Sequence, residues 1–291
     1  MPDTRRRPIP AKSPVKSPVK KRKSEFTAAT ADKHDLYQRS VQDPEIEIAF
    51  IARVYKKIFG RAPLSLREDF CGTALFCGEW IRTRPDRTAI GIDLDRPTLD
   101  WGIKHNLAQL GEPGQRITLL QQNVLDPVQQ DSDIAVGLNF SYWVFKTRDE
   151  MRAYFRGVHA SLSSEGLFVL DAYGGPYSMD PMGDEDMERT RVKGGFTYVW
   201  DQHIFNAINH DVVNHIHFEF RDGTKLERAF TYHWRFWTLP ELTELLEEAG
   251  FSRVQVYWED EDEDGEGSGV YRARKRADNG GAWVAYIIAE K

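Results

Sequence analysis

Acidic side chains stand at the ends of two extended runs in the sequence, a placement that suits the binding of a sugar. Glu68 and Asp69 end the first run just before a turn at Gly72, and Asp93 ends the second. In a parallel sheet the carboxyl ends of neighbouring strands meet at one edge, where ligands bind. A carboxylate there accepts hydrogen bonds from both hydroxyls of a ribose. Gly72 lets the backbone approach such a ligand closely, and Thr73 begins a helix whose free N–H groups face it.

The same turn is poorly suited to phosphate. Turns that hold the pyrophosphate of a dinucleotide carry the pattern G-x-G-x-x-G, which clears space for it. Phe70 and Ala74 replace two of the expected glycines here, and the carboxylates of Glu68 and Asp69 would repel a phosphate. The sequence therefore favours a ribose-bearing ligand without phosphate, preferably a cationic one, and disfavours a dinucleotide-dependent oxidoreductase.

Short apolar runs alternate with amphipathic helical patterns along the chain, and this order predicts a parallel, doubly wound sheet. We expect seven strands, at residues 64–70, 87–93, 116–121, 133–140, 166–172, 253–259 and 283–290. We expect helices at residues 45–59, 75–80, 97–110, 147–162 and 239–249. The predicted fold class is α/β, a Rossmann-like, mostly parallel seven-stranded sheet with an antiparallel β insertion after strand five.

The helix boundaries carry recognisable signals. Asp43-Pro44 predicts the start of the first helix and Gly60 its end. Thr147 with Glu150, and Thr238 with Glu241, have the spacing of capping boxes. The expected buried stripe of the first helix is Ile46, Phe50, Val54 and Ile58.

Residues 173–237 interrupt the alternation and read as antiparallel strands over the segments 196–209, 211–220 and 224–237. The last two segments meet at Arg221-Asp222-Gly223. A two-residue turn would put their apolar rows on opposite faces of the hairpin, whereas a three-residue loop with Gly223 in a bulge aligns them. We therefore predict the bulged loop. The aromatic side chains of this insertion form either a hairpin core or a lid that favours a small or flat substrate: Trp200, Phe205, Tyr232, Trp234 and Phe236.

Composition limits the class of protein. The chain has 291 residues, 41% of them hydrophobic, which suits one large α/β domain. No run approaches the roughly 20 apolar residues of a membrane span, and the start lacks the apolar stretch of a secretory signal. Cys71 and Cys77 are too few for a disulfide framework, so we expect buried thiols in a cytoplasmic protein.

Charge divides the chain into a tail and a body. Residues 1–24 carry a net charge of +8, and the rest of the chain carries −14. We expect a disordered Ser/Pro/Lys tail over residues 1–31, followed by a domain over residues 32–291. The tail keeps the protein in solution, binds nucleic acid or acts as a nuclear address. The acidic stretch 259–269 is expected to be a solvated loop, or a partner for the tail.

Four segments, in the correct order, resemble the motifs of the class I S-adenosylmethionine-dependent methyltransferases. "EDFCGTA" (68–74) resembles their acidic-x-G-x-G-x-G motif at Glu68, Gly72 and, loosely, Ala74, and departs from it at Phe70. "GIDLD" (91–95), "QQNVLD" (121–126) and "DIAVGLNFSYW" (133–143) are similar to the next three strand ends. Residues 232–258 resemble the closing helix and strand of small-molecule members such as glycine N-methyltransferase. The resemblance covers roughly residues 45–172 and 233–290 and implies S-adenosyl-L-methionine as the cofactor.

The resemblance also implies which residues bind that cofactor. Asp93 would hold the ribose, with Leu94 packed on the adenine. Glu68 would lie beside the methionine part, with Arg67 as a partner for its carboxylate. Tyr37 either folds over the cofactor as a lid or covers core surface. The full predicted set is Tyr37, Arg67, Glu68, Phe70, Gly72, Thr73, Asp93, Leu94, Asn123, Val124 and Asn139.

Methyl transfer from a sulfonium is an in-line displacement, for which a protein supplies alignment and a dry pocket. The candidate catalytic residues are Asn139, Tyr142 and Asp171. "NFSY" (139–142) stands where methyltransferases of base or glutamine nitrogens carry Asn/Asp-Pro-Pro-aromatic, which favours a small-molecule acceptor methylated on N or O. Two alternatives stay open: an RNA or protein methyltransferase that uses the basic tail, and a non-catalytic module that binds a nucleoside.

Histidines of the insertion suggest two further roles. In the bulged register His215, His217 and His233 share one sheet face with Glu219, a set able to bind zinc. A partly exposed polar face is the simpler interpretation, so no metal is expected. His203 or His233 as a general base is a further alternative.

Overall fold

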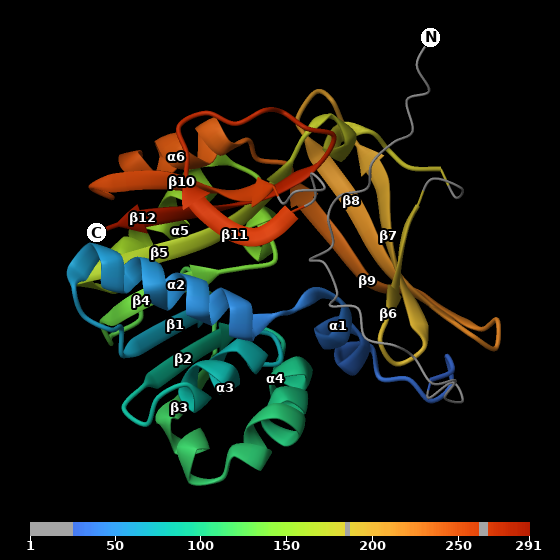
Figure 1. The fold of residues 1–291 in the computed structure, drawn as a ribbon, viewed down its shortest axis with the longest axis horizontal. Helices are drawn as coiled ribbons and strands as arrows, with labels where there is room; N and C mark the ends of the chain where they lie inside the picture. The colour runs from blue at the N-terminus through green and yellow to red at the C-terminus, as the bar shows by residue number, and fades with distance from the viewer. Residues whose placement is uncertain (1–25, 184–186, 262–266) are drawn as a thin grey trace. The chain divides into compact units, whose positions relative to one another are not determined.

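The computed structural model describes residues 26–183, 187–261 and 267–291, and the chain divides into two units (Figure 1). We call the first the parallel-sheet unit; it comprises Asp43–Ala172, Thr238–Tyr257 and Tyr286–Lys291. We call the second the antiparallel unit; it comprises Met1–Gln42, Tyr173–Trp237 and Trp258–Ala285. The basic segment 1–24 lies outside the described residues, so its predicted roles stay predictions.

Five strands of the larger sheet pair in parallel, in the order β3-β2-β1-β4-β5, with β3 at the edge of the sheet. Their bounds are β1 Ser65–Asp69, β2 Thr88–Asp93, β3 Ile117–Gln121, β4 Ser132–Gly137 and β5 Leu162–Gly174. From β1 the chain continues to β2 and β3 on one side of β1. It then crosses to β4 and β5, which lie on the other side of β1. The ends of β1 and β4 therefore form the switch point at which doubly wound sheets bind ligands.

The larger sheet has eight strands, one more than expected, in the order β11-β10-β12-β5-β4-β1-β2-β3. The strands outside the parallel set are β10 Arg253–Glu261, β11 Gly267–Ala273 and β12 Trp283–Glu290, and β11 is the one that was not expected. The prediction of a loop over residues 259–269 was wrong for its first and last residues. Residues 259–261 belong to β10, and residues 267–269 belong to β11. Asp260 of β10 pairs with Arg272 of β11 and with Arg274, which follows that strand. β11 was not expected because its sequence, "GSGVYRA", begins with three small residues and lacks an alternating apolar pattern.

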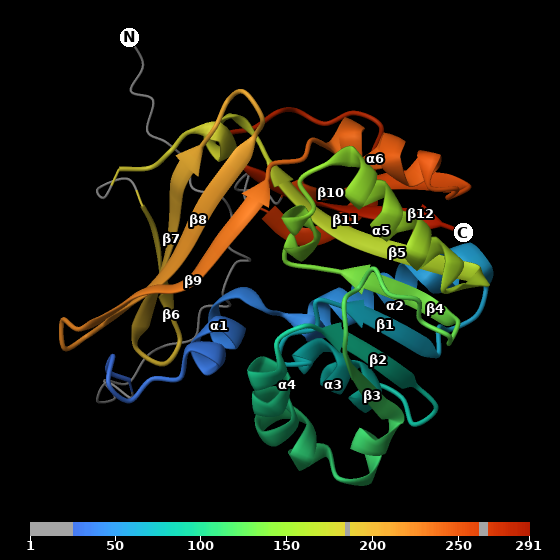
Figure 2. The ribbon, with the colours of Figure 1, turned by 180° about the vertical axis from the view of Figure 1, so that it is seen from behind.

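Helices cover both faces of the parallel strands. α2 (Pro44–Phe59) packs with α3 (Leu75–Arg82), and α5 (Arg148–Ala160) packs with α6 (Leu239–Glu248). The two views show the first pair on one face of the sheet and the second pair on the other (Figures 1 and 2). α4 (Arg96–Gly102) continues as a π-helical turn and a 3-10 turn to Leu110. Both predicted capping boxes are present, and Gly60 ends α2 in a left-handed conformation.

The buried stripe of α2 differs from the expected one. Ile46 is 55% exposed, whereas Ile48, Ile51 and Tyr55 are buried along with the expected Phe50 and Val54. Residues four apart advance 400° around a helix, so a strict four-residue stripe rotates by about 40° at each step. Alternating steps of three and four keep side chains on one face, and the sheet buries that face.

The antiparallel unit contains a four-stranded sheet in the order β6-β7-β8-β9. Its elements are α1 Lys33–Val41, β6 Glu188–Val192, β7 Phe196–Phe205, β8 Asp211–Phe220 and β9 Lys225–Arg235. Three of these strands were expected and β6 was not. Phe220 N–H donates to Thr224 O across a three-residue loop in which Gly223 has φ +85°. Phe218 lies opposite Leu226 and, beyond a register shift, Ile216 lies opposite Phe230, so the predicted three-residue loop and the aligned apolar rows are confirmed.

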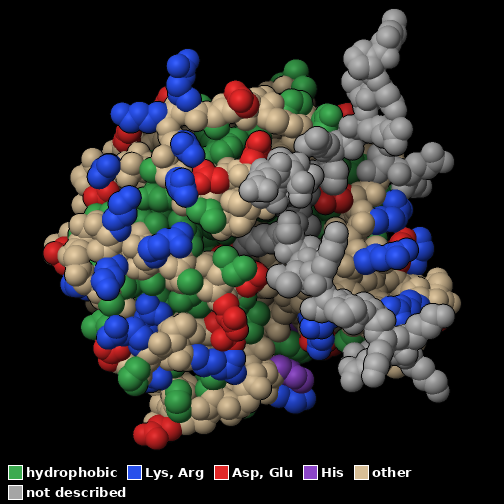
Figure 3. All heavy atoms as spheres, viewed as in Figure 1, with side chains coloured by type: hydrophobic (Ala, Val, Ile, Leu, Met, Phe, Trp, Pro, Cys, Tyr) green, Lys and Arg blue, Asp and Glu red, His purple; other side chains and the backbone are tan. Residues whose placement is uncertain are grey.

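The helices and the surface charges bear on the expectations from composition. None of the helices in the described ranges combines the length and apolar composition needed to cross a bilayer. On the face shown in Figure 3, Lys and Arg side chains are interspersed with Asp and Glu.

Candidate functional site

Backbone strain is concentrated at the ends of β1 and β4. After β1, Phe70 and Ala74 have φ of 56° and 53°, and after β4, Asn139 and Phe140 have φ of 56° and 57°. Residues other than glycine seldom adopt this left-handed region, and each instance costs of order 1–3 kcal/mol. Because β1 and β4 are parallel neighbours, both strained turns lie at the switch point of the sheet. Strain held at such a point is typical of a binding site.

The turn after β1 is joined directly to the end of β2. The backbone N–H of Gly72 donates to Asp93 Oδ2 at 2.8 Å, and that of Asp95 donates to Asp93 Oδ1 at 2.9 Å. Each carboxylate oxygen has further lone pairs, so Asp93 is fixed in position and still able to accept from two hydroxyls. The turn after β1, which is predicted to contact the ligand, therefore orients Asp93, the residue predicted to bind its ribose.

α4 supports this turn from one side. Asn106 Nδ2 donates to the carbonyl oxygen of Thr73 at 2.8 Å. A Cβ added at Gly102 would come within 2.3 Å of the same oxygen, so only glycine allows this approach. The side chain of Phe70 packs on Phe145 and Tyr154, which offsets the cost of its left-handed backbone. The departure from glycine at position 70 therefore has a packing reason.

Glu68 lies in a buried, weakly solvated place beside α3. Its Oε2 accepts the backbone N–H of Cys77 at 3.0 Å. Burial, with smaller contributions from the charges of Asp93 and Glu47, raises the pKa of Glu68 to about 8. The carboxyl group is consequently protonated at neutral pH, and a nearby cation would favour its ionisation. Cys71 and Cys77 are buried free thiols, as expected.

Arg67 is held by the sheet and its neighbours. Its guanidinium donates to Asp69 Oδ1 at 2.7 Å, Ser161 Oγ at 2.7 Å and Val124 O at 3.1 Å. Tyr154 also donates to Asp69, at 2.9 Å. Both members of the ion pair are almost fully buried. The Arg67 guanidinium was predicted to bind the methionine carboxylate. In the structure it donates hydrogen bonds to buried groups of the protein and links β1 to the segment after β3.

The residues predicted to meet adenine follow β2 and β3. Leu94, next to Asp93, is 65% exposed. Asn123 is exposed, and its Oδ1 accepts the backbone N–H of Leu125 at 3.0 Å. Val124 is buried. An exposed leucine directly after the ribose acid provides an apolar surface on which a base can pack.

The turn after β4 is organised by Asp171 at the end of β5. The backbone N–H groups of Asn139 and Phe140 donate to Asp171 Oδ2 and Oδ1 at 2.8 and 2.9 Å. Tyr142 Oη donates to the carbonyl oxygen of Asp171 at 2.8 Å, and burial raises its pKa well above the usual range. Tyr142 is completely buried, so its hydroxyl stays protonated and shapes this turn. Asp171 likewise fixes the strained backbone of the turn.

The remaining predicted residue, Tyr37, lies in the antiparallel unit. Tyr37 of α1 packs on Phe230, with ring centroids 5.0 Å apart, beside a buried cluster that contains Leu36 and Phe218. Tyr173 is buried, and its hydroxyl accepts from Asn214 Nδ2 at 3.3 Å. Within this unit Tyr37 therefore covers the surface of a buried hydrophobic cluster.

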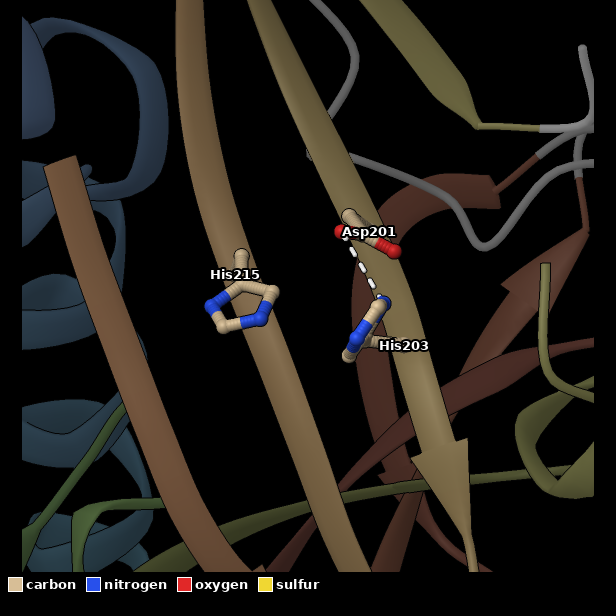
Figure 4. A group of neighbouring side chains, drawn as sticks. All are labelled: Asp201, His203 and His215. Carbon is tan, nitrogen blue, oxygen red and sulfur yellow. Dashed lines mark ion pairs between the residues drawn. The ribbon is translucent and has the colours of Figure 1, made fainter. Parts of the chain in front are cut away.

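The zinc set considered from the sequence is not the group that the structure brings together. Among the described residues, the structure groups Asp201, His203 and His215 (Figure 4), whereas Glu219 pairs with Lys225 and His233 is exposed outside the group. The missed signal was the Asp-x-His spacing in "WDQHIF" (200–205), which places two ligand types on the strand beside His215. Lys225 directly opposite Glu219 explains why that carboxylate is not available.

A groove of about 560 Å³ lies elsewhere in the parallel-sheet unit. It is lined by Glu45, Ile48, Ala49, Ala52, Glu79, Arg82, Thr83, Arg84 and Arg87. None of these is a predicted site residue. The groove is therefore separate from the predicted set of site residues.

The fold is shared with solved methyltransferase structures. No protein-family model and no curated protein matches the chain. An S-adenosylmethionine-dependent methyltransferase from Clostridium acetobutylicum is 14% identical, with a TM-score of 0.63 over 88% of this chain and 96% of that one. DesVI from Streptomyces venezuelae is 18% identical, with a TM-score of 0.62 over 91% and 98%. CalS10 from Micromonospora echinaspora is 14% identical, with a TM-score of 0.61 over 93% and 99%. The chain therefore has the α/β fold of these structures, including its β insertion.

Proposed function

We propose that this protein is an S-adenosyl-L-methionine-dependent methyltransferase that acts on a small-molecule acceptor. The observation that carries the proposal is the hydrogen bond from Gly72 N–H to Asp93 Oδ2, because it joins the sharp turn after β1 to a carboxylate able to accept ribose hydroxyls. The strained turns after β1 and β4 support it, since they lie at the edge where this fold binds ligands.

The described donor set fits the proposed cofactor. Asp93 would accept the ribose hydroxyls, and the exposed Leu94 would pack on the base. Glu68 would lie near the cationic part, where its burial makes it responsive to a positive charge. When bound, the cofactor supplies an activated methyl group with a neutral thioether as leaving group. We omit Arg67 from the proposed pocket because its guanidinium already has three partners inside the fold.

We propose that the residues near the methyl acceptor position it for transfer and do not act as a general acid or base. Asp171 holds Asn139 and Phe140, and Tyr142 braces Asp171 from within the core. We therefore assign Asp171 and Tyr142 to positioning the turn after β4, and the partly buried Asn139 to the edge of that turn. An amine acceptor in its neutral form needs no dedicated base for in-line displacement, which agrees with this arrangement.

Similar solved structures suggest the class of acceptor. CalS10 is described as an amino pentose methyltransferase, and KedS8 from Streptoalloteichus, with a TM-score of 0.59, as a sugar N-methyltransferase. We propose a small amine, such as an amino sugar, as the acceptor for this chain. We also propose a cytoplasmic location, since S-adenosyl-L-methionine is an intracellular metabolite.

An acceptor screen tests this function. Purified full-length protein is incubated with S-adenosyl-L-methionine and a panel of amino sugars and other small amines, and formation of S-adenosylhomocysteine is followed. We expect acceptor-dependent turnover with at least one small amine, reduced at least tenfold in Asp93→Ala. Turnover with RNA or protein acceptors alone would overturn the small-molecule assignment. Failure to bind the cofactor at all would overturn the enzyme assignment.

A further inference from the structure

Four side chains form a polar cluster on one face of the small sheet in the antiparallel unit: Asp201, His203, His215 and His217. Asp201 on β7 lies directly opposite His215 on β8. One ligand atom from each of Asp201, His203 and His215 lies within 4.8 Å of the other two. Figure 4 shows the carboxylate and the two imidazoles gathered between the neighbouring strands. Two imidazoles and one carboxylate are a donor set that zinc sites use.

A β-bulge creates this grouping. The pairing of β7 with β8 shifts between Gln202 and Ile204, so His203 is an extra residue without a partner position on β8. Bulges redirect a side chain and occur frequently beside functional sites. Here the bulge brings His203 Nδ1 to 3.9 Å from Asp201 Oδ2, while 45% of the His203 side chain stays exposed. The cluster thus has one solvent-accessible member that is free to rotate.

The carboxylate has one occupied and one unoccupied oxygen. Asp201 is only 3% exposed, and its Oδ2 lies 3.3 Å from His217 Nε2. No hydrogen-bond donor among the described residues reaches Asp201 Oδ1. A buried carboxylate oxygen without a partner costs free energy unless something binds it. The imidazoles of His203 and His217 approach the other oxygen, Oδ2, at 3.9 and 3.3 Å, so Oδ2 is the oxygen that faces the histidines.

Hydrogen bonds decide which imidazole nitrogens can bind a cation. The backbone N–H of Arg228 donates to His217 Nδ1 at 3.1 Å, so neutral His217 carries its proton on Nε2 and donates it to Asp201. His217 therefore orients the carboxylate and is not a ligand. His215 Nδ1 lies 2.9 Å from Thr231 Oγ1. If that nitrogen donates to the hydroxyl, Nε2 of His215 has a free lone pair, as in most metal-bound histidines.

We propose that Asp201, His203 and His215 bind one Zn²⁺ ion, with His217 and Thr231 orienting the ligands. Ligand atoms in a tetrahedral zinc site lie about 3.4 Å apart, given bonds of about 2.0–2.2 Å. The three ligand atoms now lie within 4.8 Å of one another, so zinc binding would draw them closer together, and His203 is the half-exposed member of the set. Three protein ligands leave the fourth position to water or another ligand. All residues of this site lie in the antiparallel unit.

Zinc titration of the full chain tests the proposal. Protein stripped of metal with a chelator is titrated with Zn²⁺ in competition with a chromogenic chelator. We expect one tight site per chain. His203→Ala should weaken it by about 100-fold or more, because loss of a ligand exceeds the roughly 10–100-fold cost of losing a supporting partner. His217→Gln should weaken it within that smaller range.

His233→Ala is the matched control, since His233 is exposed on the same sheet but lies outside the group. It should bind Zn²⁺ within twofold of the unaltered protein. Equal losses in His233→Ala and His203→Ala would contradict the ligand set, and unchanged binding in His203→Ala would contradict the site. Unaltered protein without a tight site would also overturn it.

Co²⁺ provides a readout that does not depend on affinity. Cobalt bound by two imidazoles and a carboxylate in a four- or five-coordinate site absorbs visible light far more strongly than hexaaqua Co²⁺. We expect this absorption in the unaltered protein and in His233→Ala, and its loss in His203→Ala. The far-ultraviolet circular dichroism of each variant shows whether it is folded. An aqueous-type cobalt spectrum in folded, unaltered protein would contradict the proposal.

Discussion

Gly72 and Asp93 are joined by a hydrogen bond of 2.8 Å between a backbone N–H and a carboxylate oxygen. This bond couples the turn after β1 to the end of β2, the two places at which the proposed cofactor would be held. Since the second oxygen of Asp93 accepts the Asp95 N–H, the carboxylate cannot rotate away without breaking two hydrogen bonds. The binding group is therefore positioned before any ligand arrives, which lowers the ordering cost of binding.

Gly102→Ala should damage the turn after β1. The added Cβ would meet Thr73 O at 2.3 Å, a backbone atom that cannot move aside without shifting the turn. We expect a loss of about 1–3 kcal/mol in the free energy of unfolding, typical of overpacking, and a cofactor affinity at least tenfold weaker. Urea denaturation and calorimetry measure the two effects.

Gly157→Ala is the control for this substitution. Gly157 also lies inside a helix, but an added Cβ there has no heavy atom within 4 Å. Replacement should leave stability unchanged or raise it by up to about 1 kcal/mol, because glycine is a poor helix former. Equal losses in both variants would show that helix propensity, rather than contact with Thr73, causes the effect.

Glu68→Gln should remove a pH dependence of stability. The folded protein holds the pKa of Glu68 at about 8, above its ordinary value of 4.5, so the folded state binds the extra proton between these values. Stability from this group is complete below about pH 4.5 and is lost as the pH rises towards 8, by at most about 1.4 kcal/mol per unit. Glutamine resembles the protonated carboxyl and does not ionise.

The measurement is the difference in unfolding free energy between the unaltered protein and Glu68→Gln at pH 5.5, 6.5 and 7.5. Relative to the variant, the unaltered protein should lose stability at each step. A difference that stays constant with pH would show that Glu68 is ionised in the folded protein, contrary to its burial.

Cofactor binding should release a proton at neutral pH. A positively charged ligand beside Glu68 favours its ionised form and lowers its raised pKa. Calorimetric binding enthalpies in buffers of different ionisation enthalpy report this release. We expect a buffer-dependent enthalpy for the unaltered protein and a smaller dependence for Glu68→Gln. The same buffer dependence in both proteins would place the cation away from Glu68.

Asp171→Asn should loosen the turn after β4. Both carboxylate oxygens accept backbone N–H groups of residues in the left-handed region, and an amide presents an NH₂ group to one of them. We expect a loss of about 1–3 kcal/mol, the cost of an unsatisfied buried group. Asp149→Asn, on an exposed pair, should cost at most about 0.5 kcal/mol. Comparable losses measured by urea denaturation would argue against a special role for Asp171.

The sequence predicted the parallel sheet well because its signals are local. Capping boxes at Thr147 and Thr238, the glycine after α2 and the apolar strands each lie within a few residues of the feature that they define. The three-residue loop at Gly223 could also be predicted, since only one loop length aligned the two apolar rows. In each case a short segment contains the information.

Features that depend on distant partners could not be read in this way. β11 is recognisable only when Asp260 is placed opposite Arg272 and Arg274. The choice of Asp201 and His203 over His233 depends on a bulge in β7 that no local pattern announces. Arg67 looked like a ligand-binding cation, yet Ser161, far along the chain, binds it inside the fold.

Calorimetry on unaltered protein and Asp93→Ala tests the central claim most directly. Each is titrated with S-adenosyl-L-methionine, S-adenosylhomocysteine and a nicotinamide dinucleotide. We predict that the unaltered protein binds the first two and not the third, and that Asp93→Ala weakens both affinities at least tenfold while Asp100→Asn, an exposed aspartate of α4, leaves them unchanged. Tight binding of the dinucleotide with no response to S-adenosyl-L-methionine, or equal affinities in Asp93→Ala and the unaltered protein, would contradict the account.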